Sequence, residues 1–190
     1  MGKSIVAWLL LAGCLLIIAE GVARETRCDP QTGKIRVLYM GDAFGIRNPF
    51  PYMKMEPSFL ATPVAACTFH STMDFIKKQM RVYMPRTQDR LSDNYDVMIL
   101  SDANREVFQP REINWMSEAV LDEGLGIIMI GGAESYEGRG GTMPTWSITT
   151  VAEVLPVKML DDEYCDQAMR MVIVDQEAEL AKSLPWDTLG

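Results

Sequence analysis

Short apolar runs alternate with amphipathic segments along most of the chain. Runs of this length, apolar at successive positions, are typical of strands that are buried on both faces of a parallel sheet. We predict such strands at residues 35–40, 64–69, 95–100, 127–130 and 169–174. Because segments with helical spacing lie between them, the pattern favours a doubly wound α/β fold with a mostly parallel central sheet.

The clearest helical segment begins at Pro110. Apolar side chains then recur at helical spacing, and Gly124 is placed to end the helix. Further helices are predicted at residues 74–80 and 145–154. Four prolines and several aromatic residues fall within residues 49–63 and exclude a long helix there. That segment either covers a site or caps the edge of the sheet.

The N-terminus has the pattern of a secretory signal peptide, which we predict at residues 1–23. Lys3 precedes an apolar run of 15 residues, and Gly21, Val22 and Ala23 form a small-residue cleavage region. The run is shorter than the ~20 residues of a membrane-spanning helix. An uncleaved membrane anchor and a lipoprotein lipidated at Cys14 remain as alternatives. We therefore predict an exported protein, periplasmic or extracellular, with a polar leader at 24–34 and one domain at 35–190.

Charge and cysteine content narrow the classes of partner. The net charge is −8, and it stays at −8 once residues 1–23 are removed, because Lys3 and Glu20 leave together. Such a surface repels nucleic acid and anionic lipid, so we expect no nucleic-acid partner. We expect membrane association only through an uncleaved signal or a lipid anchor. An odd number of widely spaced cysteines then remains, which is not a disulfide framework. These cysteines are Cys28, Cys67 and Cys165.

The candidate site lies at the carboxyl ends of the strands, where open α/β sheets bind their ligands. A glycine-rich turn from Gly131 to Gly141 follows the strand at 127–130, and Asp42 and Asp102 follow two other strands. We predict a ligand-binding crevice formed by Asp42, Asp102, Gly131, Gly132, Ala133, Glu134 and Ser135. The alternative is structural, with the glycines allowing a tight turn and the acidic residues capping strands. The turn matches neither the phosphate-loop nor the dinucleotide pattern, so we predict no cofactor.

Several segments together carry a family resemblance. They are KIRVLYM at residues 34–40, PYMKMEP at 51–57, YDVMILSD at 95–102, GLGIIMIGGAESY at 124–136 and VAEVLPV at 151–157. With these segments the chain resembles the glutamine amidotransferase-like domain of bacteria, within the class I glutamine amidotransferase-like superfamily. The resemblance implies a flavodoxin-like three-layer sandwich. It also implies truncation at Gly190, which would leave an exposed sheet edge and predicts a homodimer.

The same resemblance implies a chemistry that the residues do not supply. Class I amidotransferases place a cysteine at the turn after the strand that is here 127–130, and a histidine late in the chain activates it. This chain has glycine, alanine, glutamate and serine at that turn, and its single histidine, His70, lies about sixty residues earlier. We therefore predict a domain without catalytic activity that binds a small ligand or a protein partner in the crevice.

The alternative function is a hydrolase or amidase with a different nucleophile. Ser135 or Cys67 would attack, and Asp102 or Glu134 would assist. Cys67 and His70 are three residues apart and would share one face of a helix, so they are also candidates for a catalytic pair. As half of a metal site, this pair lacks partners nearby in the sequence, and no metal is predicted.

Overall fold

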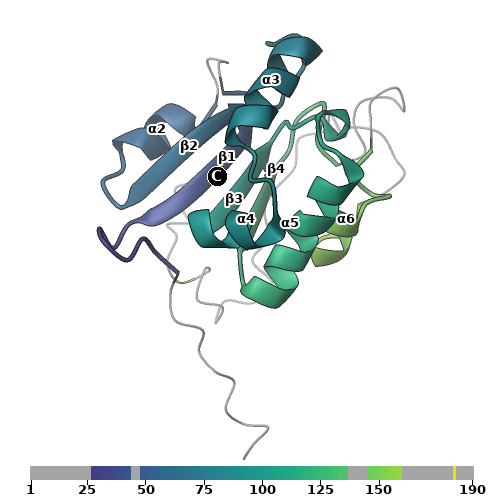
Figure 1. The fold of residues 1–190 in the computed structure, drawn as a ribbon. Helices are drawn as coiled ribbons and strands as arrows, with labels where there is room; N and C mark the ends of the chain where they lie inside the picture. The colour runs from purple at the N-terminus through teal and green to yellow at the C-terminus, as the bar shows by residue number, and fades with distance from the viewer. Residues whose placement is uncertain (1–26, 44–47, 137–144, 160–181, 183–190) are drawn as a thin grey trace, which may run out of the picture.

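A computed structural model describes residues 27–43, 48–136, 145–159 and 182, and within them the fold is α/β. Four parallel strands form one sheet in the order β2-β1-β3-β4 (Figure 1). They are β1 (Ile35–Gly41), β2 (Phe59–Ala65), β3 (Val97–Ser101) and β4 (Gly126–Ile130). All three neighbouring pairs are parallel, which is compatible with a flavodoxin-like arrangement.

Helices lie on both sides of this sheet. In chain order they are α2 (Phe50–Met55), α3 (Met73–Tyr83), α4 (Gln88–Asn94), the 3₁₀ helix η1 (Arg105–Val107), α5 (Pro110–Glu123) and α6 (Thr150–Val154). The larger core packs α3, α4, α5 and α6 onto one face of the sheet. On the opposite face α2 covers part of the strands, so the described residues form a three-layer arrangement (Figure 1).

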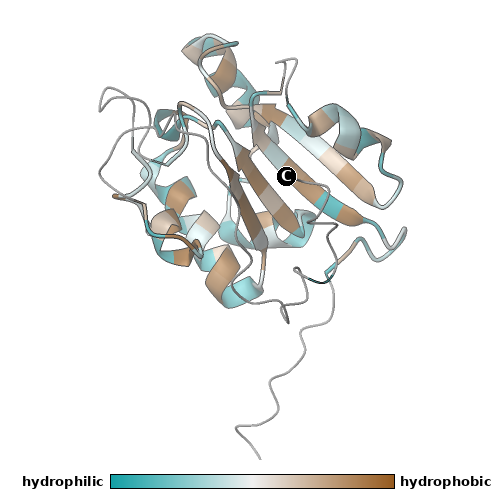
Figure 2. Cartoon of the chain, turned by 180° about the vertical axis from the view of Figure 1, so that it is seen from behind, coloured by the Kyte–Doolittle hydropathy of each residue, from teal (hydrophilic) through white to brown (hydrophobic). Residues whose placement is uncertain are grey.

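Successive side chains in the middle of β1 enter different cores. In β1, Leu38 and Met40 pack into the larger core, whereas Val37 and Tyr39 pack with Ile99 against α2. Seen from behind, the strands are hydrophobic along most of their length (Figure 2). This two-sided burial is the reason that β1 and β3 appear in the sequence as continuous apolar runs, since neither face of a central strand meets water.

The most regular parts of the sequence pattern are confirmed. Strands form at residues 35–41, 97–101 and 126–130, close to the predicted bounds, and α3 extends the helix predicted at 74–80. The helix that begins at Pro110 ends at Glu123. Gln109 and Glu112 form a capping box at its start, and Gly124 adopts a left-handed φ of 70° at its end.

Two predicted elements have wrong bounds, and two helices, α2 in the proline-rich segment and α4, were not predicted. The second strand is Phe59–Ala65, not 64–69, because Pro63 fits the edge of a sheet, where its missing N–H costs no ladder bond. The helix expected at 145–154 begins only at Thr150. The polar helix α4 was not predicted, although Thr87 caps its start by accepting a hydrogen bond from the backbone of Arg90.

The polar leader is fastened to the amino ends of the strands. Arg27 donates hydrogen bonds to the carbonyl oxygens of Ser92, in the last turn of α4, of Tyr95, just after α4, and of Glu123, the last residue of α5. Asp96, just before β3, accepts from the side chain of Arg36 at 2.7 Å and 3.0 Å and from its backbone N–H at 2.8 Å. These contacts tie the chain entering β1 to the helix ends that precede β3 and β4.

Several predictions fall outside the described residues. These are the signal peptide at 1–23, the lipidation alternative at Cys14, the strand at 169–174, Cys165, the turn beyond Tyr136 and the truncation at Gly190. Within the described ranges, no helix has the length and apolar composition needed to cross a membrane.

Candidate functional site

The connection order of the sheet defines where a crevice belongs. From β1 the chain moves outward to β2 and then returns past β1 to form β3, so the direction of winding reverses between β1 and β3. In open α/β sheets, ligands bind at this reversal, outside the carboxyl ends of the strands. Asp42 follows β1 and Asp102 follows β3 at this reversal, and the turn that starts at Gly131 follows the neighbouring strand, β4.

The ends of β1 and β3 lie unusually close together. Gly41 has a φ of 150°, and a Cβ atom at this position would overlap the carbonyl group of Ser101. The backbone N–H of the next residue, Asp42, donates to the same carbonyl oxygen at 3.0 Å. Glycine is required here by the close approach of two backbones, and that approach brings the Asp42 and Asp102 segments to the same edge.

Glu134 is the most deeply buried polar side chain of the turn, with 0% exposure. One carboxylate oxygen, Oε2, accepts from the backbone N–H of Thr68 at 2.6 Å. The other, Oε1, accepts from the amide of Asn104 at 2.7 Å and from the hydroxyl of Thr68. The carboxylate therefore joins three segments, those that follow β2, β3 and β4, and it is directed into the protein and away from solvent.

Asp102 holds the same turn from the other side. Its Oδ1 accepts from the backbone N–H of Glu134 at 2.6 Å, and its Oδ2 lies 3.6 Å from the thiol sulfur of Cys67. Its φ is 50°, a left-handed conformation that is uncommon outside glycine, asparagine and aspartate. Burial raises the pKa of Asp102, the hydrogen bond from Glu134 opposes this, and the negative charges of Glu134 and Asp42 raise it further.

The two glycines of the turn differ in what they provide. A Cβ atom on Gly132 would lie 2.6 Å from the Cβ of Asp102, so this position needs glycine for space. A Cβ atom on Gly131 would meet only a ring atom of Tyr136, at an ordinary 3.7 Å. Neither glycine has a left-handed φ, whereas Tyr136 has one of 52°. Glycine is therefore required at position 132 because a larger residue would overlap Asp102. A left-handed backbone is not the reason for glycine at either position.

The predicted nucleophiles are engaged elsewhere. The hydroxyl of Ser135, which is 3% exposed, donates to the carbonyl oxygen of Ile130 at 2.7 Å. Cys67 is buried, and this burial raises the pKa of its thiol to about 12. At neutral pH only about one thiol in 10⁵ would then be a thiolate, the form that attacks a carbonyl group. Neither side chain has the activated state that nucleophilic catalysis requires.

Cys67 and His70 do not form the pair that their spacing suggested. The segment between them is a turn, so the prediction that the two side chains share one face of a helix was wrong. Cys67 points towards Asp102, while His70 is exposed and its Nε2 lies 3.7 Å from Asp42 Oδ2. We call the outer surface formed by Asp42, His70 and the exposed Gly131 and Gly132 the rim of the predicted crevice.

Two residues at the centre of the network were missed by sequence reasoning. Thr68 and Asn104 supply three hydrogen bonds to the Glu134 carboxylate, and they come from segments 66 and 30 residues earlier in the chain. For Asn104 the sequence offered a positional signal, since this residue follows the strand predicted at 95–100. Thr68 lay inside the strand predicted at 64–69, so its position after a strand became visible only with the observed bounds of β2. Trp146 adds a further tie, because its indole N–H donates to the carbonyl oxygen of Ala103 at 2.9 Å.

The chemistry of this edge is that of a hydrogen-bonded polar network beneath an open rim. Glu134 and Asp102 accept from neighbouring segments, whereas His70 and the glycines of the turn are exposed, and the Asp42 side chain beside His70 is 18% exposed. In the part of the chain that the structure describes, His, Cys, Asp and Glu side chains form no group of three that could hold a metal ion.

The fold and this edge define an α/β protein with a parallel sheet and a polar network at the carboxyl ends of its strands. Comparison with protein-family models gave no match, and neither did a search of curated proteins.

Proposed function

We propose that the chain is an exported glutamine amidotransferase-like domain without catalytic activity, which binds a small ligand or a protein partner at the carboxyl ends of β1, β3 and β4. The proposal includes a flavodoxin-like sandwich as the finer fold class. The sheet order β2-β1-β3-β4 supports that class, because the flavodoxin-like sheet begins with the same four strands in the same order.

The observation that carries the proposal is the burial of Glu134. In the family that the sequence resembles, the turn after the strand equivalent to β4 presents a cysteine nucleophile. Here the turn directs a carboxylate inward, where it accepts hydrogen bonds from Thr68 and Asn104 at 0% exposure. A side chain so engaged stabilises the turn, and the groups left on the outside are suited to contact with a ligand.

The rim supplies the binding groups of the proposed site. Gly131 and Gly132 are exposed and leave their backbone accessible, while His70 and Asp42 contribute an imidazole and a carboxylate 3.7 Å apart. Small polar ligands are typically held by a few such groups fixed on rigid elements. The Glu134 and Asp102 network keeps these groups in place from below.

L-Glutamine is the first ligand to test, because it is the substrate of the family that the chain resembles. We expect L-glutamine, titrated into the full chain, to shift the backbone amide resonances of Gly131, Gly132 and Asp42 without release of ammonia. Asp42→Asn should weaken these shifts, and Asp93→Asn, at an exposed position near the other end of the sheet, should not. Shifts confined to other regions would overturn the choice of site.

The hydrolase alternative makes the opposite prediction in the same experiment. Ammonia release from L-glutamine, or hydrolysis of p-nitrophenyl acetate, that disappears in Cys67→Ala or Ser135→Ala would replace our proposal with that alternative. The raised pKa of Cys67 provides a second measurement: alkylation by iodoacetamide at pH 8 should be slow at Cys67 until the protein is unfolded. Rapid alkylation of the folded chain would contradict the buried, protonated thiol.

A further inference from the structure

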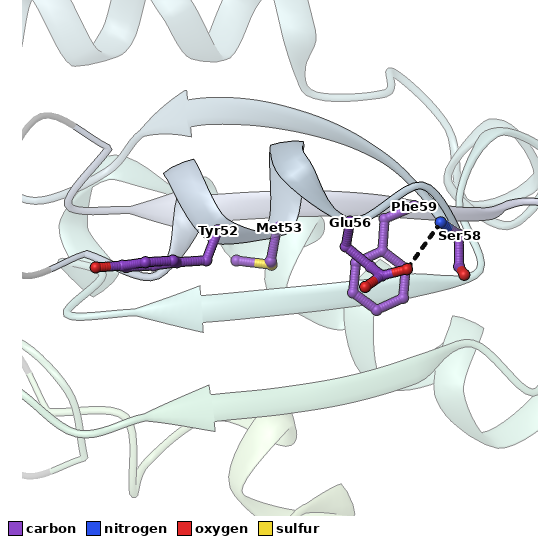
Figure 3. A pocket seen from close by; sticks show the side chains of 5 residues that line it. All are labelled: Tyr52, Met53, Glu56, Ser58 and Phe59. Carbon is purple, nitrogen blue, oxygen red and sulfur yellow. Dashed lines mark hydrogen bonds between the residues drawn. The ribbon is translucent and has the colours of Figure 1, made fainter.

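A hollow of about 390 Å³ lies between α2 and the start of β2, in the proline-rich segment (Figure 3). Its lining residues are Tyr52, Met53, Glu56, Ser58 and Phe59. Phe59 is the first residue of β2, and the crevice lies beyond the last one, Ala65. At about 3.3 Å per residue the two ends of β2 are about 20 Å apart, so this hollow is separate from the crevice.

Two aromatic rings flank the hollow. Figure 3 shows Met53 between Tyr52 on one side and Phe59 on the other. Met53 and Phe59 pack against the core formed by Val37, Tyr39 and Ile99, so this side of the hollow rests on the sheet. Tyr52 is 76% exposed and leaves its ring open to solvent. Exposed ring faces carry the negative part of the aromatic quadrupole, which attracts organic cations.

A carboxylate completes the lining. Glu56, the C-cap residue of α2, is exposed, and its Oε1 accepts from the backbone N–H of Ser58 at 3.1 Å (Figure 3). This bond holds the carboxylate at the hollow. A fixed negative charge beside aromatic rings favours a positive ligand, and the net charge of −8 on the chain adds a general attraction for cations.

We propose that this hollow binds the alkylammonium group of a small organic cation. The positive head group would lie on Met53, with the Tyr52 ring on one side and the Glu56 carboxylate and the Phe59 ring on the other (Figure 3). Recognition of quaternary ammonium groups by aromatic rings follows the same physical logic. The proposal assigns a role to the proline-rich aromatic segment that is independent of the crevice.

Choline is the probe, and 3,3-dimethylbutanol is its neutral control of nearly the same shape. We expect choline, titrated into the protein in the form in which the cell produces it, to shift the amide resonances of residues 52–56, 58 and 59. The neutral control should bind with a dissociation constant at least about twofold to fivefold higher. This difference corresponds to the contribution of an exposed cation–π contact. Equal binding of the two compounds, or no binding of choline, would overturn the proposal.

Variants measure the contributions of the Glu56 charge and the Tyr52 ring to choline binding separately. Tyr52→Leu and Glu56→Gln should each weaken choline binding about twofold to fivefold, and Tyr52→Phe should retain it because the ring face is kept. Glu118→Gln, at an exposed position on α5, is the matched charge control and should leave binding unchanged. If Tyr52→Leu and Glu56→Gln bind choline as the unaltered chain does, the hollow is not the cation site.

A lysine side chain offers the same ammonium chemistry from a different source. Titration with Nα-acetyl-lysine amide beside choline distinguishes the two, since tighter binding of the lysine derivative identifies a polypeptide side chain and tighter binding of choline identifies a free quaternary amine. Failure of both compounds contradicts an alkylammonium site.

Discussion

The two ends of the parallel sheet hold buried carboxylates in different ways. At the amino end, Asp96 is 3% exposed and pairs with Arg36, whose guanidinium lies 2.7 Å from its Oδ1. Arg27 lies 3.8 Å from the same oxygen. At the carboxyl end, Glu134 accepts from uncharged donors on Thr68 and Asn104. One end neutralises its buried charge with cations, and the other disperses it over neutral hydrogen bonds.

This difference appears in the pKa values of the two aspartates. Burial would raise the pKa of Asp96, but the hydrogen bonds and charge of Arg36 outweigh burial and hold this pKa below its usual value. At Asp102 burial dominates, and the charges of Glu134 and Asp42 add to it, so the pKa is raised. The amino end is thus a charge-paired clamp, whereas at the carboxyl end the negative charges of Glu134 and Asp42 act on a buried Asp102.

The largest expected effect is at the amino end. Asp96→Ala removes the acceptor of three hydrogen bonds from Arg36 and leaves its guanidinium without its buried partner, which we expect to lower the free energy of unfolding by about 3 kcal/mol. Urea denaturation measures this change. Asp93→Ala, at an exposed position in α4, is the control and should alter stability by less than about 0.5 kcal/mol. Equal effects of the two variants would refute the clamp.

At the carboxyl end, Glu134→Ala leaves the donors of Thr68 and Asn104 buried and unpaired. We expect a loss of about 2 to 3 kcal/mol in the free energy of unfolding, again measured with urea. Glu134→Gln should lose less, about 1 to 2 kcal/mol, because one acceptor oxygen remains while the new amide faces a donor. A Glu134→Ala variant as stable as the parent would mean that the network does not hold the turn.

A smaller effect distinguishes the two neighbouring glycines of the turn. Gly132→Ala forces a methyl group against Asp102 and should destabilise the protein by about 1 to 3 kcal/mol. Gly131→Ala meets only an ordinary contact with Tyr136 and should stay within about 0.5 kcal/mol of the parent. Thermal denaturation of the two variants side by side tests this, and the reverse ranking would show that Asp102 does not occupy the space beside Gly132.

The smallest effect is a difference in pH dependence. Because the pKa of Asp96 is lowered, this residue stabilises the folded protein at pH values above its usual pKa of 3.8. This stabilisation is lost as the pH falls through the pKa of the folded state. The raised pKa of Asp102 does the opposite: its contribution is greatest below 3.8 and is lost as pH rises through the folded pKa.

Urea denaturation of Asp96→Asn and Asp102→Asn between pH 3 and pH 7 measures both dependences. Relative to the parent, Asp96→Asn should become less harmful as the solution is acidified, and Asp102→Asn should become less harmful as pH rises. Parallel pH profiles for the two variants would remove the distinction between the two ends of the sheet.

The hydrophobic pattern predicted those strands and helices that can be recognised from their own residues and the residues beside them. The strands at 35–41, 97–101 and 126–130 are apolar apart from Arg36 and Ser101. The helix from Pro110 to Glu123 has its capping box and its terminal glycine beside it in the sequence. The strand Phe59–Ala65 was harder to place, because Pro63 argues against a strand unless the strand is known to lie at an edge. That knowledge depends on strand order, which no local pattern contains.

The candidate site shows the same division. The sequence by itself determined that Asp42, Asp102 and the turn at Gly131–Ser135 follow apolar strands, since burial on both faces of a parallel sheet requires such runs. Only the tertiary structure decided that Glu134 turns inward to Thr68 and Asn104, and that Cys67 faces Asp102 while His70 faces Asp42. The physical reason is that hydrogen bonds between residues 30 to 66 positions apart form only once the sheet has brought the strand ends together.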